Sequence, residues 1–324
     1  MKVLITGGAG YIGSHTNRYF SRMGAETVVL DDLSAGHREA VIAGRLVRGD
    51  FGDAGLVDRL MAEEHFDAIV HFGAFADVAD SVADPAKYYE NNVDRMLTLL
   101  KGARDHGIRY FVFSSSAAIF GEPVYTPIDE NHPKNPINPY GRTKLIGEYL
   151  LQDFERAYGM RYCALRYFNA AGAAKDGALG ESHTPEHHLI PLIQRSAMEP
   201  DFTLSVYGTD YPTRDGSCLR DYVHVEDLAA AHWLGLRYIM DNDESQCFNM
   251  GSGRGVTVLE LLEAMERLLG HEIPSQMAGR RPGDPAVLLA DNRKVCSLLG
   301  WEPVNSGLDD ILKDAWRWEQ WRKY

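Results

Sequence analysis

Short apolar runs alternate with longer amphipathic stretches along the first half of the chain. Residues 2–6 form an apolar run that predicts a buried strand, and residues 11–23 follow with a helical pattern that ends at Gly24. This unit recurs, which is typical of strands that pair in parallel with helices on both faces of one sheet. Further strands are expected near residues 27–30, 46–48, 68–71, 110–114 and 163–167, and helices at 54–64, 85–105 and 139–158.

The pattern weakens after Asn169. Residues 172–221 are rich in Gly, Pro, His and Asp, so we expect a loop-rich segment that covers a substrate. A short buried strand is expected at 247–249, and helices are expected at 225–240, 258–269 and 308–322. The last helix carries three tryptophans that are predicted to be packing residues, namely Trp316, Trp318 and Trp321.

Together these elements predict an α/β fold with two domains. Residues 1–170 should form a Rossmann-type doubly wound parallel sheet that binds a dinucleotide. Residues 171–324 should form a smaller, partly interleaved C-terminal α/β domain that binds the substrate, and segments near 225–250 should return to the first domain.

Charge and composition narrow the choice of partners. The net charge of −13 repels nucleic acid and anionic membranes, so neither is expected as a partner. No apolar run approaches the ~18 residues of a membrane span, and no charged segment followed by an apolar stretch opens the chain. The four cysteines show no Cys-x-x-Cys spacing, which argues against disulfides and a zinc site. We expect a small-molecule enzyme of the reducing cytoplasm.

A glycine-rich turn separates the first strand from the first helix. It contains Gly7, Gly10 and Gly13. The first glycine permits a tight turn, the second lets a pyrophosphate approach the backbone, and the third lets the helix pack on the sheet. The helix N-terminus then offers free N–H groups to the phosphates. The turn therefore predicts a dinucleotide cofactor.

Acidic residues after the next two strands favour NAD over NADP. Asp31 and Asp32 end the second strand, where a carboxylate accepts hydrogen bonds from the adenosine ribose and would repel a 2′-phosphate. Asp50 follows the third strand. It is a candidate to bind the adenine amino group, and the alternative is a plain turn residue.

Tyr140 and Lys144 lie four residues apart in a predicted helix whose N-cap is Asn138. This spacing places phenol and ammonium on one face, where the cation should lower the pKa of the phenol. Ser116 ends a parallel strand, at the edge where such sheets bind ligands. Beside a nicotinamide, Ser116, Tyr140 and Lys144 would form a catalytic site. There a hydride passes between one carbinol carbon and the cofactor, while a proton passes between its hydroxyl and the protein.

These motifs resemble those of the extended short-chain dehydrogenase/reductases, and within them the 4-epimerases of UDP-sugars, over essentially the whole chain. The resemblance is carried by residues 6–15, 114–117, 139–144, 165–169, 207–213, 220–225 and 280–284. It implies that Tyr140, as a phenolate, removes the proton of the sugar 4-hydroxyl while NAD takes the C4 hydride. The 4-keto sugar then turns its other face to the cofactor, and the hydride returns without net redox change.

The resemblance also implies further contacts. Tyr140 and Lys144 are implied to contact the cofactor as well as to act in catalysis, and the implied additional cofactor residues are Tyr11, Ile12, Phe51, Phe72, Asn91 and Phe168. The implied substrate residues are Ser116, Asn169, His188, the backbone at Leu189, Tyr207, Arg220, Arg281 and Asp284. The two arginines also suit a diphosphate by their own chemistry, although surface ion pairs are the alternative. A homodimer through the helices at 85–105 and 139–158 is implied as well.

Some positions depart from the family pattern. Ala76 stands where some members carry a lysine that contacts the cofactor, and Asp77 adds an anion, so we expect weaker NAD retention. His187 and His188 replace an asparagine pair of the sugar pocket. His183 is near them, but we expect no metal site because no carboxylate or cysteine completes one.

Several functions stay open at this point. UDP-glucose and UDP-galactose are the expected substrates, but Leu288, at a position that gates sugar size, also leaves UDP-xylose, UDP-arabinose and UDP-N-acetylglucosamine possible. A net nucleotide-sugar dehydrogenase or reductase is an alternative. Dehydration is disfavoured because Ala117 and Ala118 replace the acidic pair that elimination requires. A noncatalytic NAD-binding module would not need Ser116, Tyr140 and Lys144 together.

Overall fold

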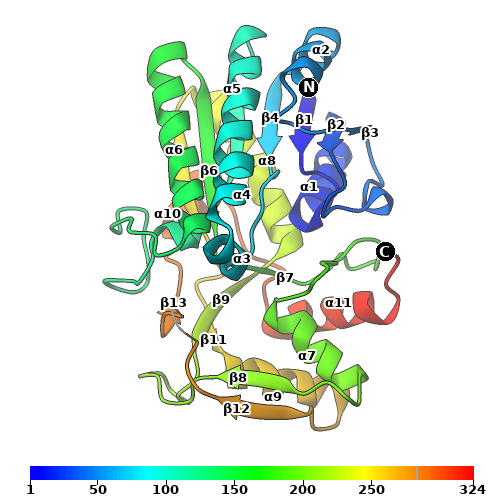
Figure 1. The fold of residues 1–324 in the computed structure, drawn as a ribbon, viewed down its shortest axis with the longest axis vertical. Helices are drawn as coiled ribbons and strands as arrows, with labels where there is room; N and C mark the ends of the chain where they lie inside the picture. Colours follow the sequence, from blue (N-terminus) through cyan, green and yellow to red (C-terminus); the bar gives the residue numbers. More distant parts are fainter. Residues whose placement is uncertain (282–283) are drawn as a thin grey trace.

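A seven-stranded parallel sheet forms the upper part of the computed structural model, which describes residues 1–281 and 284–324 (Figure 1). The strand order is β10-β6-β5-β4-β1-β2-β3, and every pairing is parallel. The strands are β1 (Lys2–Thr6), β2 (Glu26–Asp31), β3 (Arg45–Arg48), β4 (Ala68–His71), β5 (Tyr110–Ser116), β6 (Arg161–Tyr167) and β10 (Gln246–Met250). This confirms the predicted Rossmann-type sheet.

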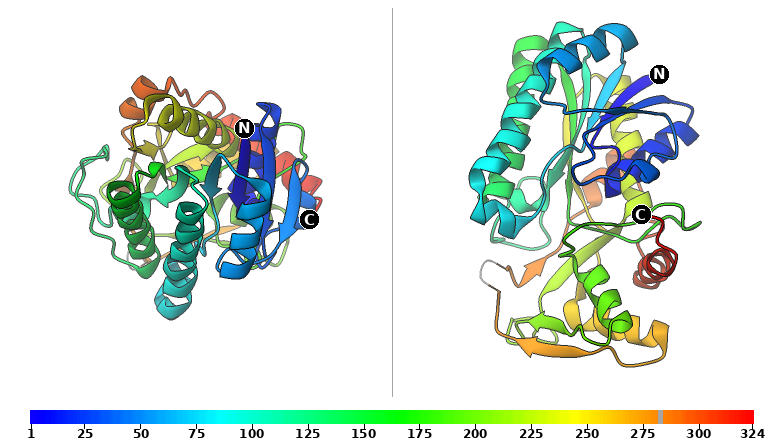
Figure 2. Two further views of the ribbon diagram at one scale, coloured as in Figure 1. Left: turned by 90° about the horizontal axis from the view of Figure 1, so that it is seen from above. Right: turned by 45° about the vertical axis from the view of Figure 1, so that its right-hand side comes forward.

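Helices cover both faces of this sheet (Figure 2). One face packs against α2 (Ala54–Glu64), α5 (Arg95–Asp105) and α6 (Pro139–Tyr158). The other face packs against α1 (Tyr11–Arg22), α8 (Val225–Asn242) and α10 (Arg293–Leu299). Alternate residues of each strand point to opposite cores, as the pleat requires, so Leu4 belongs to one cluster and Val3 and Ile5 to the other.

The helix predicted at 85–105 is interrupted. It consists of α4 (Pro85–Tyr89), the π-helical turn η2 (Glu90–Asp94) and α5, and the additional helix α3 (Val78–Ala83) precedes it. Asp77 and Asp84 cap α3 and α4. Two short 3₁₀ turns, η1 (Arg38–Ala40) and η3 (Ala117–Ile119), complete the upper part.

The lower part has its own core and two small sheets. Strand β9 (Leu219–His224) pairs with β7 (Asn169–Ala171), β11 (Gly255–Thr257) and β13 (Val287–Leu288), while β8 (Leu204–Tyr207) pairs with β12 (Ser275–Ala278). Three helices enclose the core, namely α7 (Leu189–Met198), α9 (Val258–Leu269) and α11 (Leu308–Gln320).

The expected loop-rich segment at 172–221 contains more regular structure than its composition indicated. Helix α7, strand β8 and the start of β9 all lie within it. Buried Ile190 and Ile193 face the lower core from α7, and Leu204 and Val206 alternate into it from β8. These elements are short and flanked by Gly and Pro, which hid their periodicity.

The two parts of the chain interleave. Strand β10 and helix α8 return to the upper sheet, as the sequence predicted for segments near 225–250. Residues 293–301 return as well, because Val295 and Trp301 are buried in the upper core. We propose to treat residues 1–170 as the dinucleotide domain and 171–324 as the substrate domain, with these segments as returns. No helix of the described residues is both long and apolar enough to cross a membrane.

Candidate active site

The predicted catalytic and cofactor residues meet at the carboxyl edge of the upper sheet. The sheet order reverses between β1 and β4, and this reversal opens the crevice in which such folds bind ligands. Gly7 follows β1 and approaches Gly73, which follows β4, so closely that a Cβ on Gly7 would lie 2.6 Å from the Gly73 nitrogen. The reversal thus lies directly at the glycine turn.

The glycine turn fits a pyrophosphate. Gly7 has a φ of +70°, which favours glycine, and a Cβ on Gly13 would lie 2.2 Å from the Gly7 carbonyl oxygen. A Cβ on Gly10 would have only that oxygen nearby, at 3.4 Å. The chain therefore packs against Gly7 and Gly13 but leaves the surface of Gly10 accessible, which is what close approach of a phosphate requires.

Asp31 organises the same turn. Its two carboxylate oxygens accept hydrogen bonds from the backbone N–H groups of Ala9 and Leu33, each at 2.9 Å. Burial raises the pKa of this carboxyl, and the two backbone hydrogen bonds oppose that shift. The residue therefore fixes the turn, and its remaining lone pairs can accept from a ribose.

Asp32 and Asp50 differ from Asp31. Asp32 is exposed and accepts from the backbone N–H of Ser34 at 2.8 Å. Asp50 accepts from the backbone of Gly52 at 2.7 Å and lies 3.0 Å from the Arg95 guanidinium. These contacts give Asp50 the turn role that the sequence left open, and its contact with adenine stays a prediction.

The other residues implied to bind the cofactor border the crevice or lie just beneath it. Tyr11 donates to the Gly172 carbonyl, and burial raises the pKa of its phenol well above the usual range. Phe51 is buried under Gly73. Ile12 and Phe72 pack on the α1 side of the sheet, Phe168 packs beside Ala117, and Asn91 donates to Asn92 within the π-helical turn. None of these cofactor roles is tested by the geometry alone.

The catalytic candidates come from β5 and α6. Asn138 caps α6 by accepting from the Gly141 N–H at 2.8 Å, as predicted. Ser116 ends β5 close enough to the Tyr140 phenol that its hydroxyl opposes the rise in the pKa of that phenol. Lys144 is buried, donates to the Ser114 carbonyl at 2.7 Å, and lies 5.9 Å from the centroid of the Tyr140 ring. The structure thus brings all three predicted residues together.

The expected fall in the pKa of Tyr140 does not arise from the chain alone. Burial raises the pKa of Tyr140, and hydrogen bonding to Ser116 only opposes that shift. Burial lowers the pKa of Lys144 to about 7, so its ammonium is a weak counter-charge near neutrality. Desolvation is the largest cause of both shifts, since Lys144 is buried, Tyr140 is half-buried, and no counter-ion among the described residues contributes to either shift.

Two features that position Tyr140 were not singled out from the sequence. A Cβ on Gly141 would lie 2.5 Å from the Ala118 carbonyl oxygen, so this glycine lets the start of α6 approach η3. One turn beyond Lys144, the buried Glu148 carboxylate accepts from the Arg166 guanidinium at 2.8 Å through each oxygen, and from Ser115 at 2.7 Å. The sequence did contain a signal for this ion pair, because Arg166 interrupts an otherwise apolar strand and a buried arginine needs a carboxylate partner.

The candidate substrate residues form two groups in the lower part. Arg220 on β9 donates to the Pro285 carbonyl at 2.8 Å and lies 3.5 Å from the Asp284 carboxylate. The Arg281 guanidinium lies 4.4 Å from the centroid of the Tyr207 ring. Residues 282 and 283 of the same motif lie outside the described residues. Asn169 joins this group through β7, because its amide donates to the Asp221 carbonyl at 3.0 Å.

His188 and Leu189 lie at the start of α7, where His188 is the N-cap and Leu189 the first helical residue. The expectation that no carboxylate accompanies the nearby histidines is wrong. Glu181 and Glu186 lie with His183 and His188 in one cluster, whereas His187 faces Asp77 at 3.3 Å. A loop carries these residues, and no helix or strand period indicates which of its side chains meet.

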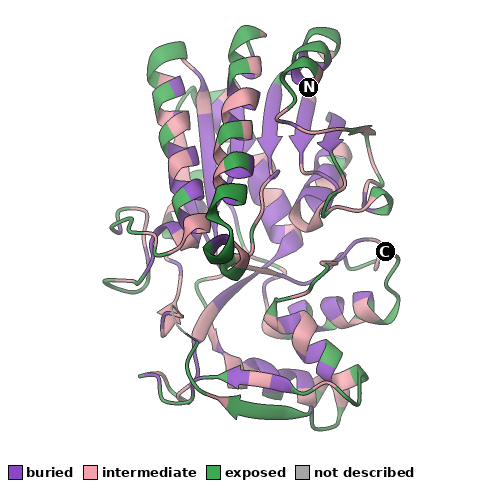
Figure 3. Cartoon of the chain, in the orientation of Figure 1, coloured by how far each residue is buried: buried purple, intermediate pink, exposed green. Residues whose placement is uncertain are grey.

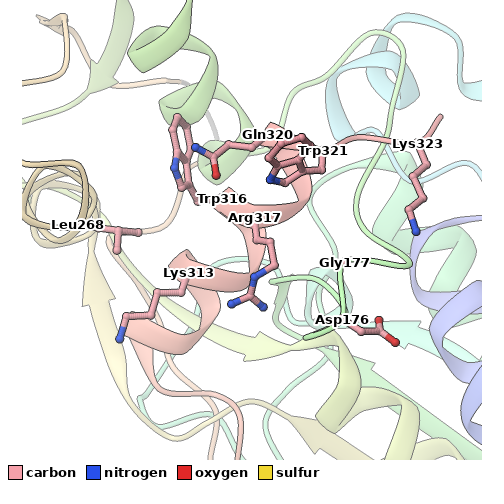
Figure 4. A pocket seen from close by; sticks show the side chains of 9 residues that line it. All are labelled: Asp176, Gly177, Leu268, Lys313, Trp316, Arg317, Gln320, Trp321 and Lys323. Atoms are coloured by element: carbon pink, nitrogen blue, oxygen red, sulfur yellow. The ribbon is translucent and has the colours of Figure 1, made fainter.

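A surface pocket beside α11 contains none of the predicted site residues. It is lined by Asp176, Gly177, Leu268, Lys313, Trp316, Arg317, Gln320, Trp321 and Lys323 (Figure 4). Trp321 is 74% exposed there, so its prediction as a packing residue is wrong. Trp318 is buried, as predicted.

Fold and site together define an NAD-dependent enzyme of Rossmann type. The model of the NAD dependent epimerase/dehydratase family matches residues 3–251, and the chain belongs to this family. Membership agrees with the predicted NAD cofactor and with the predicted enzyme. It also agrees with the resemblance to the extended short-chain dehydrogenase/reductases.

Individual relatives are similar along their whole length. The chain is 47% identical to a UDP-glucose 4-epimerase of Lactobacillus helveticus over 321 residues, which are 99% of this chain and 97% of the relative. A crystal structure of UDP-glucose 4-epimerase from Brucella ovis in complex with NAD has a TM-score of 0.95 and 47% identity, and covers 97% of each chain. A UDP-glucose 4-epimerase from Stenotrophomonas maltophila, with bound NAD and formylated UDP-arabinopyranose, has a TM-score of 0.95, 37% identity, and coverage of 99% and 98%.

Proposed function

We propose that the chain is an NAD-dependent 4-epimerase of UDP-sugars that interconverts UDP-glucose and UDP-galactose. One observation carries this proposal: Ser116, Tyr140 and Lys144 meet at the cofactor crevice, while Arg220, Arg281 and their partners gather in the substrate domain. The similarity to enzymes named UDP-glucose 4-epimerase supports the same reading.

The chain supplies proton transfer and orientation in this reaction. When bound, NAD would supply a reversible hydride acceptor and a positive charge. The Tyr140 phenolate accepts the proton of the sugar 4-hydroxyl and gives it back, while Ser116 orients that hydroxyl. Burial raises the pKa of Tyr140 in the chain alone, so a stable phenolate there would need a further positive charge, which the bound cofactor would supply.

The substrate groups suit a firmly held nucleotide and a free sugar. The guanidinium groups of Arg220 and Arg281 offer several N–H donors to a diphosphate, and Tyr207 offers a ring beside Arg281. We propose that Asn169, the Leu189 backbone and Asp284 complete the nucleotide contacts. A nucleotide held in this way leaves the sugar able to turn about its link to the diphosphate, which inversion at C4 requires.

The choice of sugar depends on the residues beside Tyr140. Leu288 packs with Phe168 against the apolar cluster that contains Ala117 and Leu145. A branched side chain of medium size there fits a hexose, and the complex of the Stenotrophomonas relative with a formylated pentose nucleotide keeps UDP-arabinose and UDP-xylose as alternatives. UDP-N-acetylglucosamine remains a second alternative because a leucine leaves more room than an aromatic residue.

We propose a homodimer that forms through the exposed outer faces of α5 and α6 (Figure 3). Both helices already use their apolar faces against the sheet, so this contact would use residues such as Tyr149, which is about half exposed. We also propose a cytoplasmic location, which agrees with four free cysteines.

A panel of UDP-sugars tests the proposed function. UDP-glucose, UDP-galactose, their N-acetyl forms, UDP-xylose and UDP-arabinose are offered to the full chain with NAD, while C4 inversion and NADH absorbance are followed together. Inversion of UDP-glucose and UDP-galactose without accumulation of NADH is expected. NADH that accumulates without an inverted sugar would favour a net dehydrogenase, and binding of NAD without either reaction would favour a noncatalytic module.

A further inference from the structure

We propose that Glu181, His183, Glu186 and His188 form a binding site for one divalent transition-metal cation, with Zn²⁺ as the best-matched ion. The four residues lie in the loop between β7 and α7. Each offers one ligand atom, and these atoms all lie within 4.8 Å of one another. The inference does not rest on the proposed epimerase activity, although it assigns to the cation the His188 side chain that the resemblance implied as a substrate contact.

The spacing of the donor atoms fits tetrahedral coordination. The Nδ1 atom of His183 lies 3.3 Å from Glu181 Oε1 and 3.4 Å from Glu186 Oε2, and the Nδ1 atom of His188 lies 2.9 Å from Glu181 Oε1. Four ligands at about 2.0–2.1 Å from a zinc ion lie roughly 3.3 Å from one another. These three histidine–carboxylate separations lie close to this value, and all four ligand atoms lie within 4.8 Å of one another, so the side chains must close in by less than about 1.5 Å around an ion.

The donor atoms also have the right chemistry. Two imidazoles and two carboxylates are a ligand set that zinc accepts, and two carboxylates balance the charge of a divalent ion. The Nδ1 atom of His183 and the Oε2 atom of Glu186 are buried without a hydrogen-bond partner, although they face one another. Buried polar atoms in this condition are costly, and a shared metal ion would satisfy both.

Contacts behind the ligands hold them in place. The Oε1 atom of Glu186 accepts from the backbone N–H groups of His187 and His188, each at 2.8 Å, and lies 2.9 Å from the His188 Nδ1 atom, and this leaves Oε2 for the ion. The carbonyl of Glu181 accepts from the Trp318 indole at 2.8 Å. Outer contacts of this kind orient metal ligands and tune their affinity.

The loop is anchored to three distant parts of the chain. Ser182 donates to the backbone carbonyl of Tyr324 at 3.1 Å, and its own carbonyl contacts His37 at 3.2 Å. The ring of His183 meets the edge of Tyr11 in the cofactor turn at 6.4 Å between centroids. Figure 1 shows the C-terminus beside this loop. A metal ion here would fasten the start of α7 to the cofactor turn, so its role is structural.

Metal binding by the full chain tests the proposal. Protein treated with a chelator and then dialysed against Zn²⁺ should retain about one equivalent. The double variant Glu181→Gln/Glu186→Gln should bind at least about 100-fold more weakly, because two charged ligands are lost. His187→Gln is the matched control, since His187 lies in the same loop but outside the cluster, and it should retain the wild-type metal affinity.

A spectrum of the wild-type chain covers the case in which the variants fail to fold. Co²⁺ in place of Zn²⁺ should give the intense visible bands of a four-coordinate site with nitrogen and oxygen ligands. Three results would overturn the proposal. They are a weak six-coordinate Co²⁺ spectrum, a zinc content far below one equivalent per chain, and equal metal affinity of the wild type and the double variant. The four residues would then form His–Glu ion pairs only.

Discussion

The cofactor turn and the nucleotide-sugar region bind in different ways. At the turn the chain itself is shaped to the ligand, because Gly7 and Gly13 admit no side chain and Asp31 holds two backbone N–H groups. In the substrate domain the candidate contacts are long side chains, such as Arg220 and Arg281, presented from separate strands and loops. A backbone cradle suits a cofactor that stays bound, whereas movable side chains suit a substrate that must enter, turn and leave.

The largest effect is expected where the two regions meet, at Tyr140. Tyr140→Phe removes the hydroxyl that transfers the proton, so kcat should fall by about 10³-fold, within the usual range for loss of a general acid or base. Affinity for NAD and for the UDP-sugar should change little, and steady-state kinetics with a binding assay separate the two. Tyr238→Phe, on α8 at the opposite face of the sheet, is the control and should keep wild-type kcat. An undiminished kcat in Tyr140→Phe would remove this residue from the mechanism.

A change in the cofactor turn should affect NAD alone. In Gly13→Ala the new Cβ would lie 2.2 Å from the Gly7 carbonyl oxygen, so the backbone of the turn must shift. The Kd for NAD should rise by at least about 10-fold, as expected for a loss of roughly 1.4 kcal/mol or more. Gly279→Ala meets no atom within 4 Å and serves as the control in the same titration. Equal Kd values for both variants would show that the turn does not determine NAD binding.

The substrate region should show the opposite behaviour. Arg281→Met keeps a long side chain but removes the guanidinium, so KM for the UDP-sugar should rise by about 10-fold while kcat stays within about threefold. The Kd for NAD should not change. A fall in kcat with constant KM would place Arg281 in the chemical step and break the distinction between the two regions.

The last expected effect is on stability rather than on catalysis or binding, and it concerns the buried Lys144. Burial lowers its pKa to about 7, whereas the unfolded chain keeps the ordinary value of 10.5. The unfolded state therefore binds more protons between these values, so this group makes the folded state more stable as pH rises from about 7 to about 10. Without NAD, the difference in thermal midpoint, wild type minus Lys144→Met, should become more positive as the pH rises from about 7 to about 10. A difference between the two proteins that does not vary with pH would contradict the burial of an uncompensated ammonium.

The upper sheet was predictable because its strands and helices repeat with clear periods. Lys2–Thr6, Ala54–Glu64 and Pro139–Tyr158 match the expected elements, since apolar residues recur at the spacing of each. Elements of the substrate domain such as Leu204–Tyr207 were missed, because the Gly- and Pro-rich sequence around them masked their alternation.

The candidate site was predictable where chemistry follows from local sequence. Ser116, Tyr140 and Lys144 are each tied to a strand end or a helix turn, and they meet as expected. Contacts between distant residues carry no such signal. The Glu148–Arg166 pair joins α6 to β6, and the Glu181–His188 cluster depends on how a loop folds back, so neither follows from residue spacing.

Reversible hydride removal at C4 is the central claim, and the fate of the C4 hydrogen tests it most directly. UDP-galactose labelled with deuterium at C4 is converted in ordinary water, and unlabelled UDP-galactose is converted in D₂O. The account predicts that the UDP-glucose product keeps its C4 label in the first reaction and gains no deuterium at C4 in the second. Loss of the label to solvent, or uptake of solvent deuterium at C4, would contradict it.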